Sequence, residues 1–298
     1  MTETAQQTSL AIDFPGAVAS SAYLAIVNGS HDETAIVGPR GEGKTILALA
    51  GQVGHAMRHH AAGYPLPVVW LGVADTLRSH ELKTHDSLRD PLWGGCWRIK
   101  DAGQMAEFRL EGQSLVRLRL TGVEDQAGMD RVRTQCHAVW FEEPAPAAVQ
   151  VQSSGLSRQA WGLALTSRRM PSYAHPAIMT LNPPPDEDHW TWARFHAEPC
   201  PEGCAGESVV RYIDWLGAVR EVEHGCRHRR MYRIPKGERV SEEQLRANAD
   251  ALSGDPAMLR RLVEGEPGGL ALGEVVAHGF NRDLHAPRGY RAQPDGTA

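Results

Sequence analysis

The stretch TAIVGPRGEGKTIL at residues 34–47 constrains the fold of this chain more than any other feature. Its residues from Gly38 to Thr45 match G-x-x-x-x-G-K-[ST], a phosphate-binding loop that connects a strand to a helix. The apolar run at residues 35–37 supplies the strand, and the pattern ILALA directly after Thr45 begins a helix. The stretch therefore predicts a nucleotide-binding α/β fold.

Each residue type in this loop has a physical reason. The glycines let backbone N–H groups close around a β-phosphate, and the positive N-terminus of the following helix points at it. We expect Lys44 to reach the β- and γ-phosphates and the Thr45 hydroxyl to hold Mg²⁺, so ATP and Mg²⁺ are the expected cofactors. The expected ATP-binding residues are Gly38, Pro39, Arg40, Gly41, Glu42, Gly43, Lys44 and Thr45.

Composition narrows the class of protein. At 298 residues the chain has room for one large domain, with or without a smaller one. The polar N-terminus has no signal layout and no apolar run approaches a membrane span, so we expect a cytosolic protein. Five cysteines do not suggest a disulfide framework. A net charge of −5 argues against a generally basic nucleic-acid binder but permits one arginine-lined DNA surface.

Hydrophobic patterning predicts strands that alternate with helices. Alternation of apolar and polar residues at 108–120 predicts a β-hairpin, and residues 76–87 and 241–263 are expected to be helical. Continuous apolar runs are typical of buried parallel strands. The runs expected to be strands are residues 68–73, 136–141, 164–166 and 177–181. This order predicts an α/β fold with a mainly parallel central sheet.

The chain divides into four regions by composition. Residues 1–33 form an N-terminal lead-in, and residues 34–190 form the expected phosphate-loop ATPase core. Cysteine, histidine and arginine then become frequent, and we interpret residues 191–265 as a small lid or linker subdomain. Residues 266–298, rich in Gly and Pro, are the expected C-terminal exit segment.

A second strand ends in two acids, at residues 138–143 (AVWFEE). In a phosphate-loop ATPase, one carboxylate at such a strand end supports the Mg²⁺ shell, and the next orients and deprotonates the attacking water. We assign the metal-side role to Glu142 and the general-base role to Glu143. Asn182, after the run at 177–181, can hydrogen-bond the γ-phosphate or the water and so transmit the effect of hydrolysis to the rest of the domain. An Asn before Pro183 can equally start a turn, and the chemistry alone leaves both interpretations open.

Taken in order, these motifs resemble the ATPase part of the large terminase subunit of tailed bacteriophages, the motor that packages DNA. The resemblance rests on the loop GPRGEGKT, the acidic strand VWFEEP and the coupling motif TLNP. It extends to residues 121–133 before the acidic strand and to residues 262–281 beyond the core. It therefore covers about residues 34–285, and the ordered set is more specific than the loop and the double acid alone.

The resemblance implies a RecA-like ATPase of the catalytic-glutamate (ASCE) class, with Lys44 and Glu143 in catalysis and Asn182 coupling hydrolysis to movement. Its implied partners are double-stranded DNA, a portal protein, a small terminase subunit and further copies in a ring, in the host cytoplasm. Two alternatives remain open. One is another nucleic-acid translocase or helicase-like ATPase, and the other is a nucleotide-binding assembly protein that does not hydrolyse ATP.

Two departures from the family pattern matter. Glu142 stands where the wider ATPase class usually has Asp. The family normally continues into an RNase H-like nuclease with clustered metal-binding aspartates, whereas the acids after Glu266 are only Glu274, Asp283 and Asp295. Two-metal cleavage needs several converging carboxylates. We therefore expect no nuclease activity from this chain, and a separate nuclease chain or a longer polypeptide to supply it.

A zinc site is a weaker expectation. Cys200, Cys204, Cys226 and His228 bracket an expected hairpin at residues 208–222 and offer a tetrahedral set of donors for Zn²⁺. Their spacing is not a common zinc pattern, and unbonded cysteines are the alternative.

An arginine finger is the last expectation. In a ring, Arg131 or Arg133 of one subunit can reach the nucleotide of the next. A surface salt bridge is the alternative for both.

Overall fold

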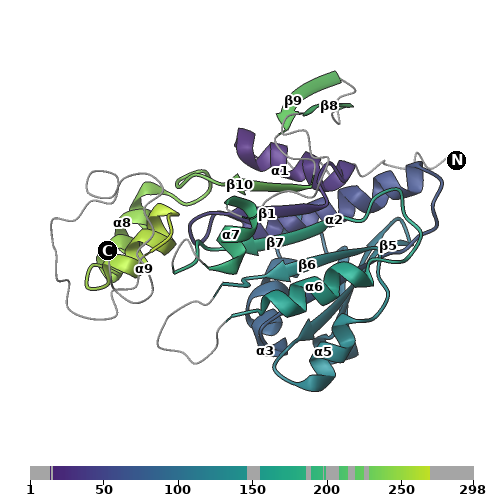
Figure 1. The fold of residues 1–298 in the computed structure, drawn as a ribbon, viewed down its shortest axis with the longest axis horizontal. Helices are drawn as coiled ribbons and strands as arrows, with labels where there is room; N and C mark the ends of the chain where they lie inside the picture. Colours follow the sequence, from purple (N-terminus) through teal and green to yellow (C-terminus); the bar gives the residue numbers. More distant parts are fainter. Residues whose placement is uncertain are drawn as a thin grey trace, which may run out of the picture.

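Among the residues that the structure describes, eight strands form one central sheet (Figure 1). The computed structural model describes residues 14, 16–145, 155–185, 189–196, 198, 208–213, 219–224 and 228–268. The strand order is β10-β1-β7-β6-β2-β5-β4-β3, and the strands from β10 to β5 are all parallel. Their bounds are β1 Glu33–Val37, β2 Val68–Ala74, β3 Trp97–Lys100, β4 Met105–Leu110, β5 Gln113–Gly122, β6 Ala138–Glu142, β7 Ala177–Leu181 and β10 Arg229–Arg233.

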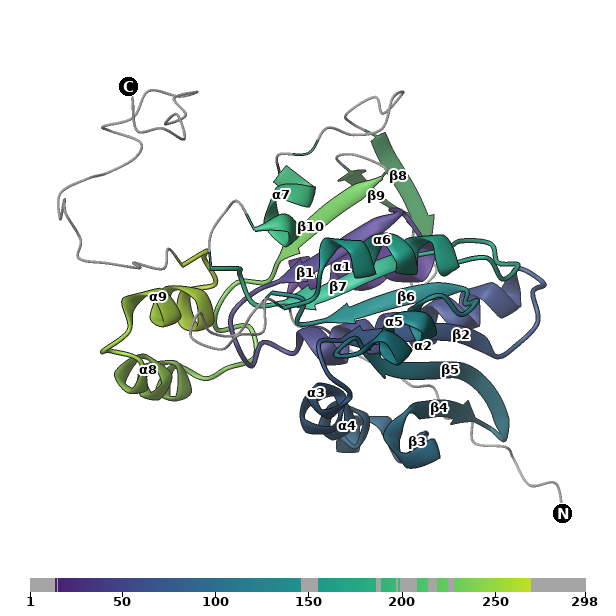
Figure 2. The same ribbon diagram turned by 60° about the horizontal axis from the view of Figure 1, so that its bottom comes forward.

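Helices cover both faces of this sheet (Figures 1 and 2). Successive side chains of a strand point to opposite faces, so each strand contributes to two cores. In β6, for example, Trp140 packs on the side of α1 (Ala17–Asn28) and α2 (Lys44–Ala61). Phe141 packs on the other side. The helices on that second side are α5 Gln126–Val132, α6 Arg158–Ser167 and α7 Trp190–His196.

The helix α2 is buried between the sheet and α1. Its Gly51 and Gly54 lie against α1, where an added Cβ would stand 2.8 Å from Ile26 and 2.5 Å from Val27. Small residues at these positions therefore let the two helices approach closely. The helix predicted at residues 76–87 is broken into α3 (Leu77–Ser79), a π-helical turn η1 (His80–Thr84) and α4 (His85–Leu88).

The structure confirms the hairpin predicted at residues 108–120, because β4 and β5 pair antiparallel. Strand β3 extends this antiparallel edge of the sheet, between the single turns η2 (Pro91–Trp93) and η3 (Asp101–Gly103). A separate antiparallel pair, β8 (Ser208–Ile213) and β9 (Val219–His224), agrees with the hairpin expected at residues 208–222. No helix in the described ranges is both long and apolar enough to cross a membrane.

The strand predicted at residues 164–166 is wrong, because this segment is the end of α6. The hydroxyl of Ser157 accepts a hydrogen bond from the backbone N–H of Ala160 and so caps the start of that helix. The buried residues of α6 recur at helical spacing, and they are Ala160, Trp161, Ala164 and Ser167. The short apolar run is a turn of this amphipathic helix.

The range 191–265 contributes to the main sheet as well as to a peripheral helical unit. Strand β10 lies within it and pairs in parallel with β1 at the edge of the sheet. The single helix expected over residues 241–263 is three pieces, because Asp255 and Pro256 start a new helix after the first one ends. The pieces are α8 Glu242–Ala251, α9 Pro256–Leu259 and the π-helical turn η4 Arg260–Glu264.

Candidate active site

The phosphate-binding loop leaves the carboxyl end of β1 and runs directly into α2. Gly41 and Gly43 have φ values of 90° and 77°, in the left-handed region where glycine is favoured, and Gly43 immediately precedes the helix. The helix begins at a cavity of about 600 Å³, which Lys44, Thr45 and Ile46 line. The N-terminal N–H groups and the positive end of α2 are therefore at the cavity, as phosphate binding requires.

Lys44 is buried within the loop, with 6% of its surface exposed. Its Nζ donates to the carbonyl oxygens of Gly38 and Pro39, at 3.0 and 2.6 Å, and to Oδ1 of Asn182 at 3.0 Å. Burial lowers the pKa of Lys44, whereas the charge of Glu143 raises it. The three acceptors hold the ammonium group between the loop and the end of β7.

Thr45 connects the start of α2 to the acidic end of β6. Its Oγ1 donates to Oε1 of Glu142 at 2.8 Å. The other carboxylate oxygen of Glu142 accepts a hydrogen bond from Thr180 in β7. The hydroxyl of Thr180 in turn accepts from Nε1 of Trp140 at 2.9 Å. Three side chains from two neighbouring strands and a helix thus fix the orientation of this carboxylate.

Glu142 is almost fully buried, with 3% of its surface exposed. Burial, together with the charge of Glu143, raises the pKa of this carboxyl to about 7, although the hydrogen bonds from Thr180 and Thr45 act to lower it. An opposite charge in the cavity would favour its ionised form. The cluster of carboxylate and hydroxyl oxygens suits a hard cation such as Mg²⁺.

Glu143 stands just beyond β6 in an unusual backbone conformation. Its φ is 50°, in the left-handed region that non-glycine residues rarely occupy. Its backbone N–H donates to the carbonyl oxygen of Thr180 at 2.8 Å, which holds it in that conformation. Strain of this kind costs on the order of 1–3 kcal/mol and clusters at functional sites.

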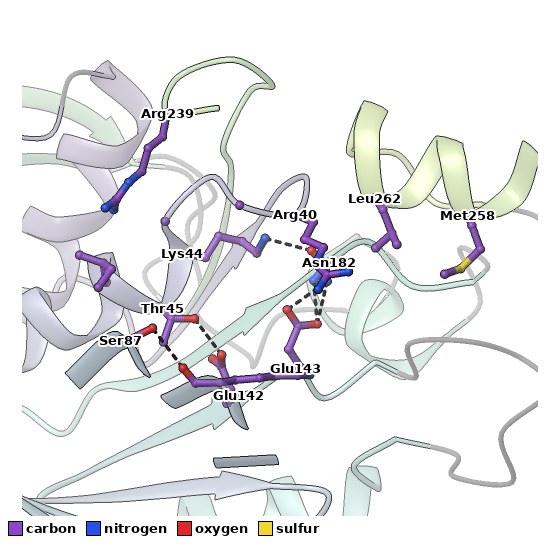
Figure 3. A pocket seen from close by; sticks show the side chains of 14 residues that line it. Arg40, Lys44, Thr45, Ser87, Glu142, Glu143, Asn182, Arg239, Met258 and Leu262 are labelled. Atoms are coloured by element: carbon purple, nitrogen blue, oxygen red, sulfur yellow. Dashed lines mark hydrogen bonds between the residues drawn. The ribbon is translucent and has the colours of Figure 1, made fainter. Parts of the chain in front are cut away.

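Asn182 links the acidic strand to the phosphate-binding loop (Figure 3). Its Nδ2 donates to both carboxylate oxygens of Glu143, at 3.0 and 3.1 Å, and its Oδ1 accepts from Lys44. Its backbone N–H also donates to Glu143 at 3.3 Å. The side chain therefore bonds a cation and an anion at once, which a simple turn-initiating Asn does not need to do.

The structure brings Lys44, Thr45, Glu142, Glu143 and Asn182 together around the cavity, as the sequence-based assignment requires. Six further residues line the cavity, and apart from Ile46, which follows the loop motif directly, they come from segments without a recognisable motif. These are Ile46, Lys83, Ser87, Arg239, Met258 and Leu262. Met258 and Leu262 come from α9 and η4, so the peripheral helical unit of α8, α9 and η4 forms one wall of the cavity (Figure 3).

Arg131 and Arg133 do not line this cavity. Arg131 donates from Nε to the hydroxyl of Thr121 at 3.0 Å, and Arg133 forms an ion pair with Asp130 at 3.3 Å. Their role as an arginine finger toward another subunit stays a prediction.

The expected zinc ligands Cys200, Cys204 and Cys226 lie outside the described residues, as do the acids Glu274, Asp283 and Asp295 of the exit segment. His228 is described and lies 4.0 Å from a carboxylate oxygen of Asp32. In the part of the chain that the structure describes, no group of three or more His, Cys, Asp or Glu residues could hold a metal ion. The zinc site therefore stays a prediction.

These features define the fold of a RecA-like phosphate-loop NTPase. Strand β7 lies between the loop strand β1 and the acidic strand β6, and it supplies both Thr180 and the following Asn182. Comparison of the sequence with protein-family models and with curated proteins finds no match. Comparison of the structure does find matches.

Three of these matches are structures of the large terminase from a thermophilic bacteriophage. The first has a TM-score of 0.57 at 16% identity, over 90% of this chain and 59% of the terminase chain. A second crystal form gives a TM-score of 0.53 at 15% identity, over 90% and 58%. The complex of the terminase with ADP gives 0.52 at 14% identity, over 82% and 52%. The chain thus has the large terminase fold and spans less than two thirds of the matched chains.

Proposed function

We propose that this chain is an ATP-hydrolysing motor that moves double-stranded viral DNA into a procapsid, as the ATPase of a large terminase subunit. One observation carries the proposal: the hydrogen-bonded chain Lys44–Asn182–Glu143 at the carboxyl edge of a sheet with the terminase fold. It connects the residue expected at the phosphates with the residue expected at the attacking water. The binding of ADP by a similar terminase structure supports a nucleotide in this cavity.

The loop and α2 bind the nucleotide in this proposal. Backbone N–H groups around Gly41 and Gly43 donate to the phosphate chain at the positive end of the helix. Lys44 places a buried ammonium group beside the β- and γ-phosphates. Because its present acceptors are carbonyl and amide oxygens, a phosphate oxygen can replace one of them at little cost in lost hydrogen bonds.

The residues around Thr45 fit Mg²⁺. The Thr45 hydroxyl and the Glu142 carboxylate are 2.8 Å apart, and both are oxygen donors at the edge of the phosphate site. When bound, the ion neutralises charge that develops on the phosphates. Thr180 and Trp140 keep the carboxylate oriented toward Thr45 through their hydrogen bonds.

Glu143 orients and deprotonates the attacking water, and Asn182 positions Glu143. Both carboxylate oxygens of Glu143 accept from the Asn182 amide, so the carboxylate keeps one orientation toward the cavity. When a γ-phosphate competes for Lys44, the acceptor oxygen of Asn182 loses a partner. The amide can then move, and this shift at the end of β7 is the proposed origin of the coupling between hydrolysis and movement.

The wider assignment remains part of the proposal. The motor would work in the host cytoplasm as a homo-oligomeric ring, docked on a portal protein and supplied with DNA by a small terminase subunit. The matched terminase structures support the fold of such a motor, and the partners follow from the family resemblance alone.

Steady-state ATP turnover by the purified chain, with and without linear double-stranded DNA, tests the proposal. We expect Mg²⁺-dependent turnover that DNA stimulates, and we expect Lys44→Ala to abolish it by weakening nucleotide binding. Turnover stimulated only by single strands would favour a helicase-like translocase. Nucleotide binding without any turnover would favour an assembly protein and overturn the motor.

A further inference from the structure

Arg239 lines the nucleotide cavity from a segment that contains no nucleotide-binding motif. It lies between β10 and α8, about two hundred residues after the phosphate-binding loop, and its side chain is 49% exposed. In the view of Figure 3 it stands across the cavity from Glu143, with Lys44 and Thr45 between them. Its position gives it access to a ligand, and the surrounding contacts indicate which one.

The loop itself holds this segment in place. Glu42, whose surface is 6% exposed, accepts hydrogen bonds from the backbone N–H groups of Gly237 and Arg239, at 2.6 and 2.8 Å. A carboxylate bonded to two N–H groups is a strong, directional contact. Glu42 occupies one of the variable positions of the loop pattern, so the motif alone does not demand it. Its contacts tie the position of Arg239 to the phosphate-binding loop.

The guanidinium group lies directly over Gly43. A Cβ added to Gly43 would stand 2.8 Å from Nη1 and 3.1 Å from Cδ of Arg239, so a side chain at this position would displace Arg239 from its present place. Gly43 is also the residue that precedes α2, whose N-terminus carries a partial positive charge. A cation in this place is repelled by the helix and needs an anion nearby.

The guanidinium group of Arg239 has one weak ion pair among the described residues. The ion pair that the described residues give Arg239 is with Asp90, at 3.8 Å between Nη2 and Oδ2. An exposed pair at that separation contributes under about 1 kcal/mol. The N-terminus of α2, Lys44 and Arg239 together surround a place suited to a polyanion.

We propose that Arg239 binds the α- and β-phosphates of the nucleotide, and that Glu42 is the positioning residue that holds Arg239 over Gly43. This inference rests on the proposed function, since it deepens the description of the same cavity. In this proposal, the segment after β10 closes the phosphate site on the side away from Glu143. The contact is made with the diphosphate, so ADP and ATP should depend on it equally.

Calorimetric titration of the full chain with Mg-ADP and with a non-hydrolysable Mg-ATP analogue tests the contact. We expect Arg239→Ala to raise the Kd for both ligands by about tenfold or more, the loss of a charge-assisted hydrogen bond. Arg239→Lys, which keeps the charge without the planar fork, should recover part of the affinity. Arg246→Ala is the matched control, because Arg246 is an exposed arginine of α8 that pairs with Glu242.

A double-mutant cycle tests the role of Glu42. Glu42→Gln should weaken ADP binding in the parent chain but have little further effect in the Arg239→Ala background, because its contribution acts through Arg239. Equal losses in both backgrounds would show that Glu42 shapes the loop instead of positioning Arg239. Thermal unfolding of each variant shows whether the fold is intact.

The two proposals fail in different ways. If the parent chain binds neither ligand, the nucleotide site itself is wrong. If the parent chain binds ADP and Arg239→Ala binds it with the same Kd, the site stands and the role of Arg239 is overturned. If Arg239→Ala affects the ATP analogue alone, the contact is with the γ-phosphate, and the assignment to the diphosphate is wrong.

Discussion

At the scale of single residues, Glu143 combines a left-handed backbone with a carboxylate whose two oxygens are both hydrogen-bonded to Asn182. Glycine would adopt this backbone conformation without strain, so a glutamate is kept here at an energetic cost. Glu111 has a similar φ in a hairpin turn, so the backbone conformation alone does not mark a site. The hydrogen bonds to Asn182 at the cavity are what support the general-base role proposed for Glu143.

Replacing Glu143 by Gln should leave ATP binding largely intact and lower turnover by a factor on the order of 10²–10⁴, because the amide cannot take up a proton. Separate measurements of nucleotide Kd and of kcat distinguish the two effects. Glu111→Gln is a matched control, since Glu111 also has a left-handed φ, of 49°, but lies in the turn between β4 and β5. If the Glu143 variant hydrolyses ATP at the parent rate, Glu143 is not the general base.

The motifs predicted one site because Glu142, Glu143 and Asn182 lie at the carboxyl ends of parallel strands, and the loop that leads to Lys44 and Thr45 leaves the carboxyl end of β1. Carboxyl ends of parallel strands meet at one edge of a sheet, so local patterns are enough. Thr180 and Arg239 could not be predicted in this way. Thr180 reaches Glu142 only because β7 pairs with β6, and Arg239 reaches the cavity only through a backbone contact with Glu42.

At the scale of elements, the turn η4 contacts both the phosphate-binding loop and the segment after Asn182. The carbonyl oxygen of Leu262 accepts from the backbone N–H of Arg40 at 2.9 Å. The buried Arg261 donates from Nε to the carbonyl oxygen of Pro183 at 2.8 Å. These two hydrogen bonds connect η4 to the phosphate-binding loop and to the residue after Asn182. A movement of the loop or of Asn182 is therefore expected to shift η4 and the adjoining α9.

Replacing Arg261 by Ala should loosen this helical unit without unfolding the sheet, because it removes the hydrogen bond to Pro183 and leaves a cavity. Hydrogen–deuterium exchange should speed up at residues 256–265 while β1, β6 and β7 stay protected. ATP turnover should also fall. Arg260→Ala is the control, since Arg260 is the exposed neighbour on the same turn. If exchange at residues 256–265 stays at the parent rate in Arg261→Ala as well as in the control, Arg261 does not hold this helical unit in place.

The elements also show where periodicity is a sufficient guide. Long or strictly alternating patterns predicted β2, β6, β7 and the β4–β5 hairpin, because a buried strand needs continuous or alternating apolar residues. Strand β10, with the sequence RRMYR, has no such pattern. It is an edge strand, and its place beside β1 depends on backbone pairing and not on its own hydrophobicity.

At the scale of the whole molecule, a buried group of histidines lies between α2 and the sheet. The ring of His59 is 6.2 Å from that of His55 and 5.2 Å from that of His137, and His55 stacks on Tyr173 at 5.0 Å. Burial, with the neighbouring His59, lowers the pKa of His55 to about 3 and that of His137 to about 4. Nδ1 of His137 accepts from the backbone N–H of Val69 at 2.8 Å, and protonation would break this bond.

These histidines should make the folded state unstable in mild acid. The pKa of both rings is about 6.5 in an unfolded chain, so the unfolded state takes up protons as the pH falls below 6.5. The folded state takes them up only near pH 4 at His137 and near pH 3 at His55. Above pH 6.5 both rings are neutral in both states, so stability does not depend on them there. Below pH 6.5 the free energy of unfolding falls, by about 1.4 kcal/mol per unit of pKa displacement, down to about pH 4 for His137 and about pH 3 for His55. Urea unfolding midpoints measured from pH 8 to pH 5 should fall steeply below pH 6.5.

His55→Phe keeps a buried ring that cannot titrate, so it should flatten this pH dependence. His60→Phe, at an exposed position of the same helix, should leave it unchanged. Equal slopes for the parent chain and His55→Phe would show that the acid sensitivity comes from other groups.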